Sequence, residues 1–292
     1  MATSAPTIQN HWTSVVDHSR RYQDFTYVYP VISRRSRGLS IGVNLNPDKR
    51  CNFDCVYCEV DRKTPGKATH VDLAQAADEL RWLARHALTG GLGEEEKFRE
   101  AGALTRQIRD FAFSGDGEPT MVPNFDACVE MAVGVRQELG LNDTQVVLIT
   151  DAAGLDKATV RRGLEIMDSN LGEVWGKLDA GTEGYFRQIN RGFVSFNRIL
   201  RNLTCTAQMR PIVIQSLFLK LHGERMPDVE LRAYIQRLQE MVAAGGRIKE
   251  VHAYTIARPT PETWATRLMH AELEELASVV RKETGLRVLT FD

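Results

Sequence analysis

The stretch that decides the predicted fold reads Gly38-Leu-Ser-Ile-Gly-Val-Asn-Leu-Asn-Pro-Asp-Lys-Arg-Cys51-Asn-Phe-Asp-Cys55-Val-Tyr-Cys58. Its first part, residues 39–45, is apolar and β-branched and is short enough for one buried strand. Its last part places three cysteines within eight residues, in a loop that follows this strand. We therefore expect a buried strand that carries a group of thiols at its carboxyl end.

Beyond this stretch, short apolar runs alternate with helical patterns along the chain. Five further strands are predicted, at residues 110–113, 145–150, 173–179, 211–219 and 249–256. Apolar residues have helical spacing at 73–84, 124–139, 193–203, 231–242 and 261–283. This alternation is typical of a parallel sheet covered by helices. Periodicity alone leaves open a full barrel, a partial barrel or a doubly wound sheet, but all three place their chemistry at the carboxyl ends of the strands.

The predicted domain organisation is an extension followed by a single core. Residues 1–38 show no clear periodicity over most of their length and are predicted to be an N-terminal extension packed on a larger body. Residues 39–292 are predicted to form the core barrel with a C-terminal helix. Within this core, residues 90–102 are rich in glycine and glutamate and are interpreted as a polar insertion before the second strand.

Composition excludes several classes of protein. The 292 residues include 37 Lys and Arg against 38 Asp and Glu, a balance that argues against a protein that coats nucleic acid. Five cysteines are too few for a disulfide scaffold at this length, and their odd number favours a reducing compartment, so a cytoplasmic location is predicted. No stretch approaches the roughly 20 apolar residues of a membrane span, and residues 1–10 lack the features of a secretory signal.

The spacing of Cys51, Cys55 and Cys58 indicates a metal or cluster site. A structural zinc site needs four protein ligands, and the nearest histidine, His70, lies twelve residues further on. Three thiolates instead suit a [4Fe–4S] cluster whose fourth iron is open to a ligand. Three buried apolar cysteines are the alternative, but the polar residues between them argue against it. The other two, Cys128 and Cys205, lie on helical patterns and are predicted to be packing residues.

The motif Cys51-Asn-Phe-Asp-Cys55-Val-Tyr57-Cys58 resembles the signature of the radical S-adenosylmethionine (SAM) superfamily, in which an aromatic residue usually precedes the last cysteine. Residues 33–45 resemble, more narrowly, the branch of Fe–S oxidoreductases related to wyosine-forming tRNA enzymes, and the resemblance extends to about Glu262. It implies a partial (β/α)6 TIM-type barrel with parallel strands. It also implies that the three cysteines hold a [4Fe–4S] cluster as metal ligands, with Tyr57 in the cofactor site. The resemblance further implies that SAM is cleaved reductively to a 5′-deoxyadenosyl radical, which abstracts hydrogen from a substrate.

A glycine turn follows the second predicted strand, at Gly115-Asp116-Gly117-Glu118. Glycines let a backbone approach a ligand closely, and Glu118 adds an acceptor. In the family that the cysteines resemble, a Gly-Gly-Glu motif at this place holds the amino group of SAM. Here Asp116 replaces the first glycine, which leaves the hydrogen-bond pattern open. An ordinary turn between a strand and a helix is the alternative interpretation.

Polar residues also stand at the ends of the later strands. Lys177 and Asp179 alternate around Leu178, so both side chains are expected to point to one face, where they contact a ligand or pair with each other. The resemblance implies that both contact the SAM ribose, and that the adenine or the substrate is flanked by further cofactor-binding residues at Thr150, Asp151, Gln215 and Tyr254. Two more segments are candidates for the substrate side, with solvated surface as the equal alternative: residues 186–191 and the basic run Arg34, Arg35 and Arg37.

The function predicted from these residues is that of a radical SAM oxidoreductase or transferase whose substrate is a small molecule, a peptide or RNA. No side chain is nominated as catalytic, because the cofactors supply the difficult step. The expected partners are SAM, the substrate and an electron donor such as flavodoxin or ferredoxin, with no membrane involved. The alternative is a non-catalytic metal-binding or Fe–S-binding protein with a structural or sensor role, which would not bind SAM.

Overall fold

The computed structural model describes residues 8–9, 12–17, 19–64, 66, 70–258 and 260–292. The chain forms two compact units. The first unit comprises Met1–Arg50, Pro65–Leu148 and Ala158–Gly172, and the second comprises Cys51–Thr64, Ile149–Lys157 and Glu173–Asp292.

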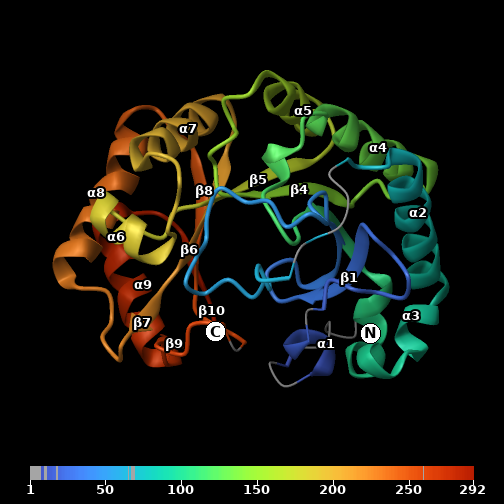
Figure 1. Ribbon diagram of the computed structural model, residues 1–292, viewed down its shortest axis with the longest axis horizontal. Helices are drawn as coiled ribbons and strands as arrows, with labels where there is room; N and C mark the ends of the chain where they lie inside the picture. The colour runs from blue at the N-terminus through green and yellow to red at the C-terminus, as the bar shows by residue number, and fades with distance from the viewer. Residues whose placement is uncertain (1–7, 10–11, 18, 65, 67–69, 259) are drawn as a thin grey trace, which may run out of the picture. The chain divides into compact units, whose positions relative to one another are not determined.

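The first unit is built on strands that lie side by side in chain order (Figure 1). They are β1 (Val28–Ser33), β2 (Gly38–Val43), β3 (Ile108–Phe113) and β4 (Gln145–Thr150), the last two residues of β4 belonging to the second unit. The pairs β2–β3 and β3–β4 are parallel, whereas β1 and β2 form an antiparallel hairpin. All six residues of β2 are buried, which agrees with its continuous apolar sequence.

The helices of the first unit pack around these strands and on one another. They are α1 (Thr13–Val16), α2 (Leu73–Thr89), α3 (Gly91–Glu94), η1 (Glu96–Arg106), η2 (Pro119–Met121), α4 (Phe125–Glu138) and α5 (Ala158–Asp168). The longest, α2, begins where the Asp72 carboxylate accepts the N–H groups of Ala74 and Gln75, both at 3.0 Å. It ends at Gly90, whose φ of 96° allows the left-handed cap.

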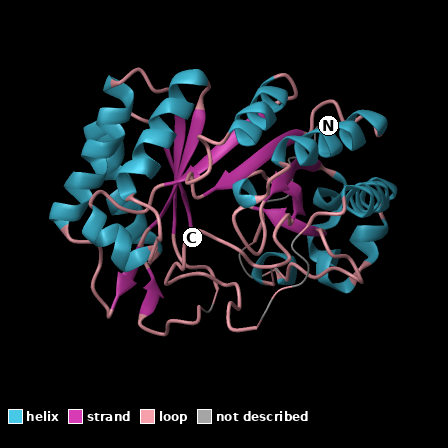
Figure 2. Cartoon of the chain, turned by 45° about the horizontal axis from the view of Figure 1, so that its top comes forward, coloured by secondary structure: helices cyan, strands magenta, loops and turns pink. Residues whose placement is uncertain are grey.

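The second unit repeats the same plan. Its strands β5 (Gly172–Lys177), β6 (Ile212–Leu217), β8 (Ile248–Tyr254) and β10 (Val288–Phe291) pair in parallel, in that order. Its helices are α6 (Glu183–Ile189), α7 (Phe196–Met209), α8 (Asp228–Ala243) and α9 (His270–Thr284), drawn in cyan beside the magenta strands in Figure 2. Two short strands, β7 (Leu219–Leu221) and β9 (Ala265–Arg267), form a separate antiparallel pair.

The predicted fold class is confirmed. The chain is an α/β protein with a mostly parallel sheet of the partial TIM-barrel type, and the six strands predicted from the sequence are β2, β3, β4, β5, β6 and β8. The boundary predicted at residue 38 stays a prediction, although β1 lies before it and pairs with β2. No helix in the described ranges is long and apolar enough to cross a membrane.

One prediction about the core is wrong. Residues 90–102 are not a polar insertion, because they form α3 and most of η1 and bury Leu92, Phe98 and Ala101. The residues Phe98, Ala101 and Leu104 lie three positions apart and are all buried. A kink at Gly102, whose φ of 51° and ψ of −123° are not helical, separates Leu104 from the other two residues. The segment therefore buries apolar side chains on both sides of this kink, among its glycine and glutamate residues.

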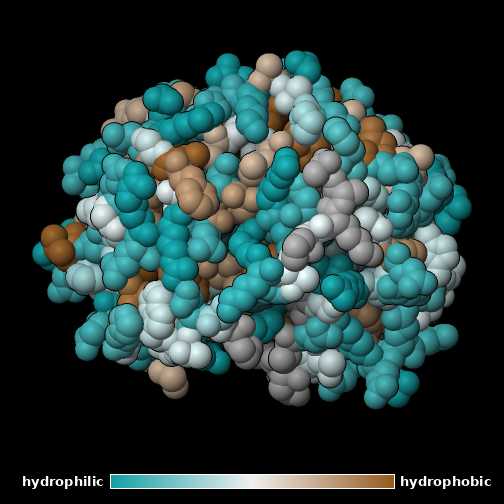
Figure 3. Space-filling view, in the orientation of Figure 1, coloured by the Kyte–Doolittle hydropathy of each residue, from teal (hydrophilic) through white to brown (hydrophobic). Residues whose placement is uncertain are grey.

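Figure 3 shows a face that is mostly hydrophilic, with hydrophobic side chains in small separate groups. The large hydrophobic side chains that are exposed come from several different elements: Trp82, Leu88, Leu171, Phe193, Met209, Val229, Val242, Met269 and Val279. Such scattered exposure is ordinary for a folded chain.

A buried carboxylate on α2 holds the segment that leads into β1. The side chain of Glu79 is 7% exposed and accepts the backbone N–H groups of Thr26 (2.9 Å), Tyr27 (2.8 Å) and Val28 (3.1 Å). It also accepts the side-chain amide of Gln75 at 2.8 Å. One side chain therefore satisfies three backbone donors that precede or begin the strand.

We expect Glu79→Ala to lower the thermal unfolding midpoint by roughly 6 °C. The unpaired N–H groups cost about 3 kcal/mol, and each kcal/mol corresponds to about 2 °C in a chain of this size. Glu79→Gln should cost less, because it keeps one acceptor oxygen. Differential scanning calorimetry measures the change, with the exposed Glu130 of α4 as the control position. A midpoint for Glu79→Ala equal to that of Glu130→Ala would contradict this role.

Candidate functional site

The cysteine loop of the second unit is held by the turn that follows α6. The N–H of Asp54 donates to the carbonyl of Asn190 at 3.0 Å, and the N–H of Val56 donates to that of Ile189 at 2.9 Å. The N–H of Phe193 donates in turn to the carbonyl of Asn52 at 3.0 Å. The loop has no regular secondary structure, so these backbone bonds determine its path.

Each of the three thiols has an N–H donor. The backbone N–H of Phe53 lies 3.5 Å from Cys51 Sγ, and the Arg62 guanidinium lies 3.5 Å from Cys58 Sγ. The third donor is the side-chain amide of Asn190, 3.4 Å from Cys55 Sγ. Burial raises the pKa of Cys55 to about 12, while the charge of Lys177 and the amide of Asn190 act in the opposite direction. These donors favour sulfur atoms that carry negative charge, as cluster ligands do.

The donor set of this loop fits a three-thiolate site. All three thiols are half-buried and none is in a disulfide. No group of three or more His, Cys, Asp or Glu side chains within the described part of the chain is already arranged to hold a metal ion. Ligation of a cluster by Cys51, Cys55 and Cys58 therefore stays a prediction, and it is supported by the number, exposure and N–H donors of the thiols.

A buried hydrogen-bond network joins the cysteine loop to the end of β5. The hydroxyl of Tyr57 donates to the carboxylate of Asp179, which also accepts the Asn190 amide at 2.7 Å and the N–H of Leu217 at 2.8 Å. Burial, followed by the charge of Asp179, raises the pKa of Tyr57 well above its usual value. The tyrosine therefore stays protonated and acts as a donor. These contacts bring together Tyr57 and Asp179, both predicted as cofactor-binding residues.

Lys177 lies next to this network and has a partner of its own. Its ammonium donates to the hydroxyl of Tyr254 at 2.8 Å and lies 4.9 Å from the centre of the Tyr57 ring. Burial acts to lower the pKa of Lys177, but its electrostatic interactions with Tyr254, Asp179 and Cys55 outweigh this effect and raise the pKa. The ammonium is therefore fixed as a cation. The predicted residues Lys177, Asp179 and Tyr254 thus lie in one connected group.

Two buried amides in the second unit each have one polar atom without a hydrogen-bond partner in the described structure. They are Nε2 of Gln215, a residue that is 1% exposed, and Oδ1 of Asn190, also 1% exposed. One is a donor and the other an acceptor. A buried polar atom without a partner is costly unless a ligand or water completes it. Both atoms therefore fit a site that binds a polar organic ligand.

The two predicted residues after β4 shape the turn that follows it. The Thr150 hydroxyl accepts the N–H of Ala152 at 3.0 Å, and the Asp151 carboxylate accepts the N–H of Ala153 at 2.8 Å. Asp151 also accepts the amide of Asn52 at 3.4 Å, which connects it to the cysteine loop. Both side chains are buried. Their role as cofactor-binding residues stays a prediction.

The glycine turn lies in the first unit. A Cβ atom on Gly117 would lie 2.0 Å from the carbonyl oxygen of Arg50, so only glycine fits here. The same carbonyl accepts the N–H of Glu118 at 2.9 Å, and Arg50 directly precedes Cys51 in the sequence. Asp116 accepts the amide of Asn44 at 2.8 Å. A Cβ atom on Gly115 would lie 2.4 Å from the side chain of the same asparagine.

The remaining predicted residues are dispersed. Arg34, Arg35 and Arg37 lie in the turn between β1 and β2. Cys128 is buried in α4, as predicted, but Cys205 is exposed on α7, so its interpretation as a packing residue is wrong. The helix predicted around Cys205 is present, but the residue lies on its exposed face and not on its buried face.

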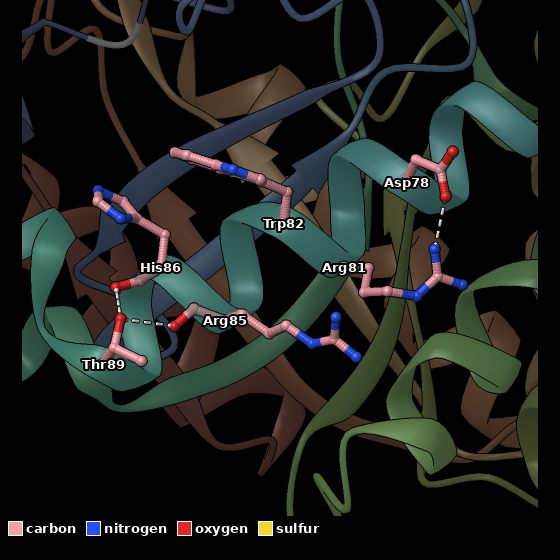
Figure 4. Close-up of a pocket in the computed structure, with 6 residues that line it drawn as sticks. All are labelled: Asp78, Arg81, Trp82, Arg85, His86 and Thr89. Carbon is pink, nitrogen blue, oxygen red and sulfur yellow. Dashed lines mark hydrogen bonds and ion pairs between the residues drawn. The ribbon is translucent and has the colours of Figure 1, made fainter.

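A hollow in the first unit lies along α2 (Figure 4). Its lining residues are Asp78, Arg81, Trp82, Arg85, His86 and Thr89. Both guanidiniums are paired with Glu138, at 2.8 Å from Arg81 and 2.9 Å from Arg85, and His86 stacks on Trp82. The two guanidiniums of this hollow are thus already paired with a carboxylate of α4, and the hollow is not a candidate site.

Sequence reasoning missed two residues of the site, Asn190 and Arg62. Asn190 falls within the segment 186–191 that the resemblance singled out, but nothing in the sequence indicates that its amide contacts a cysteine 135 positions away. Arg62 is four positions after Cys58, a short separation that could have suggested a contact with the thiol.

No protein-family model matches the chain. A UPF0026 protein of Methanocaldococcus jannaschii is 31% identical over 163 residues, 56% of this chain and 43% of that protein. A UPF0026 protein of Helicobacter pylori is 24% identical over 236 residues, 79% of this chain and 66% of that protein. GTPase Obg of Brachyspira hyodysenteriae is 25% identical over 184 residues, 59% of this chain and 23% of that protein. The chain thus spans 43% of the length of the M. jannaschii protein and 23% of the length of GTPase Obg, in both cases less than two thirds.

Two solved structures of TYW1 share the fold. The structure of TYW1 with a lysine–pyruvate adduct bound has a TM-score of 0.50 and 18% identity, covering 83% of this chain and 73% of that one. The structure of archaeal TYW1 has a TM-score of 0.51 and 11% identity, covering 85% and 73%. At these identities the two likenesses concern the fold, which is of the type that the resemblance of the cysteine motif predicted. The resemblance to the wyosine-related radical SAM branch is confirmed at the level of the fold.

We expect Asp179→Ala to lower the free energy of unfolding of the apo-protein by about 3 kcal/mol, because three buried donors lose this acceptor. Asp179→Asn keeps one oxygen and should cost less. Urea unfolding followed by circular dichroism measures both changes. The exposed Asp143 gives the control, for which Asp143→Ala should stay within about 0.5 kcal/mol of wild type. A cost for Asp179→Ala no larger than that of the control would show that the network does not stabilise the fold.

Proposed function

We propose that this chain is a radical SAM enzyme that holds a [4Fe–4S] cluster on Cys51, Cys55 and Cys58. The observation that carries the proposal is that all three thiols of the motif have N–H donors, while Tyr57 of the same loop is bonded to Asp179 at the end of β5. The motif, its donors and the polar strand ends thus meet in one unit. The shared fold of TYW1 supports the proposal.

The cofactors would supply the chemistry, and the residues of the chain would bind and orient them. When bound, the cluster would provide the electron for reductive cleavage of SAM, and SAM would provide the radical that abstracts hydrogen. Lys177 and Asp179 would bind the ribose side of SAM. The flanking polar residues Thr150, Asp151, Gln215 and Tyr254 would face the adenine or the substrate. The turn from Gly115 to Glu118 would hold the amino group.

The protonation states of the site agree with these roles. Lys177 is held as a cation and Tyr57 as a neutral hydroxyl, so neither is poised to accept a proton. Their contributions are a fixed positive charge and a fixed hydrogen-bond donor. The unpartnered donor of Gln215 and acceptor of Asn190 complement a ligand that has both kinds of group. The site is therefore suited to binding and orientation rather than to acid–base catalysis.

We further propose an oxidoreductase or transferase activity with an electron donor such as flavodoxin or ferredoxin. The substrate is a small molecule, a peptide or RNA, and the near-zero net charge weighs against RNA. Five free thiols support a reducing compartment, and we propose the cytoplasm. We also propose that residues 1–38 form an extension and residues 39–292 form the core that carries this activity.

Anaerobic reconstitution with iron and sulfide tests the function. Wild type should bind a cluster whose electron paramagnetic resonance spectrum changes on addition of SAM, and added reductant should then yield 5′-deoxyadenosine. Cys55→Ala should lose the cluster signal, because two thiolates are too few to hold it. Cys205→Ala, at an exposed cysteine outside the site, should leave it unchanged.

Two results would refute the proposal. One is a colourless protein that binds zinc in place of a cluster. The other is a cluster whose spectrum does not respond to SAM, which would instead support a structural or sensor protein.

A further inference from the structure

Asn190 occupies a special position between the cysteine loop and the end of β5. It is 1% exposed and caps the carboxyl end of α6. Its side-chain amide lies 3.4 Å from Cys55 Sγ, 3.2 Å from the Tyr57 hydroxyl and 2.7 Å from Asp179 Oδ2. One amide thus contacts a thiol, a tyrosine and a carboxylate that the proposed function assigns to the cluster and to SAM.

The main chain of Asn190 is fixed independently of its side chain. Its N–H donates to the carbonyl of Phe186 at 2.8 Å, and its own carbonyl accepts the N–H of Asp54 at 3.0 Å. The neighbouring carbonyl of Ile189 holds Val56 in the same way, at 2.9 Å. A substitution that changes only the side chain of Asn190 therefore leaves the hydrogen bonds that position the cysteine loop in place.

The amide has two hydrogens and three possible acceptors. Asp179 is the nearest acceptor and takes one hydrogen of the amide. The Tyr57 hydroxyl donates its own hydrogen to Asp179, so its oxygen can accept. The second amide hydrogen is therefore shared between the tyrosine oxygen and the thiol. Asp179 thereby orients the amide, so that one N–H is directed towards Cys55. The contact with sulfur is part-buried, because the amide is buried and the thiol is half-buried, and reduced contact with water strengthens a hydrogen bond.

We propose that Asn190 is a positioning residue that sets the reduction potential of the cluster through its N–H···S bond to Cys55. The inference rests on the proposed function. A hydrogen bond to a ligand sulfur stabilises the added negative charge of the reduced cluster and so raises its potential. The other two thiol donors are the backbone N–H of Phe53 and the side chain of Arg62, which both belong to the loop or its end. Asn190 is the donor that comes from the distant end of α6.

The experiment compares the midpoint potential of the cluster in reconstituted wild type, Asn190→Ala and Asn190→Leu. The titration uses dithionite and is followed by electron paramagnetic resonance. At a given potential, Asn190→Ala should have an equilibrium ratio of reduced to oxidised cluster about tenfold lower, which for a one-electron couple is 59 mV. Asn190→Leu has a side chain of similar size and no donor, so its midpoint should be as low as that of Asn190→Ala. Asn190→Gln, which restores an amide, should recover part of the shift.

The control is Asn202→Ala. Asn202 lies on α7 of the same unit, is 4% exposed, and donates to the carbonyls of Ala152 (2.8 Å) and Ala153 (3.3 Å). It is a buried asparagine of similar burial that contacts no thiol in the described structure. Its removal should lower the thermal unfolding midpoint of the apo-protein but leave the reduction potential unchanged. The apo-protein melts therefore separate a loss of packing from a change at the cluster.

The outcomes distinguish this inference from the proposed function. If wild type binds no SAM-responsive cluster, the proposed function fails and the inference fails with it. If wild type binds such a cluster but both Asn190 variants keep its potential, only the inference is overturned. An equal potential shift in Asn202→Ala would also overturn it, because the effect would then be merely structural. If Asn190→Ala does not fold, Asn190→Leu, which fills a similar volume without a donor, decides the question.

Discussion

The cysteine loop of the second unit depends on hydrogen bonds that come from the turn after α6. Residues 51–58 contain no helix or strand, so their backbone groups must find partners elsewhere in the fold. Ile189 and Asn190 supply two carbonyls to the loop, and Phe193 supplies an N–H. The ring of Phe53 packs edge to face on Phe186, 5.2 Å between centres, and adds an apolar contact between the same two segments. A short helix that carries no cysteine thus determines where the thiols lie.

The buried charges near this loop are tolerated because each has a matched partner. Asp179 accepts three hydrogen bonds, and Lys177 donates to Tyr254 while it lies against an aromatic ring. Isolated, either charge would be costly in the interior. Glu230 shows the same principle in the loop that follows Asp179. Its carboxylate accepts the N–H groups of Gly181 (2.6 Å) and Thr182 (3.0 Å). A second buried carboxylate therefore holds the loop that follows Asp179.

The sequence predicted the parallel strands and the cysteine loop well, because both are local patterns. It missed β10, whose four residues are too few for a clear pattern, and β1, which contains Pro30. Proline is compatible with an edge strand, and β1 stands at the end of the strand order. Segment 90–102 failed for another reason, since its few buried apolar residues are separated by glycine and glutamate and lie on short helical pieces rather than on one long helix. Cys205 failed because a helical pattern does not assign an isolated cysteine to the buried face.

Asn190 could not be predicted for a reason that also bears on function. Its position follows from α6 and its contacts from Asp179, and neither is visible in the spacing of the cysteines. The three thiols have donors of different kinds: a backbone N–H, a guanidinium at the end of the loop and a buried amide 135 residues from Cys55. The cysteine motif specifies which atoms are available as ligands, whereas the donors specify how well each sulfur bears negative charge. Two chains with the same three cysteines will therefore differ in reduction potential wherever their folds place different donors at these sulfurs.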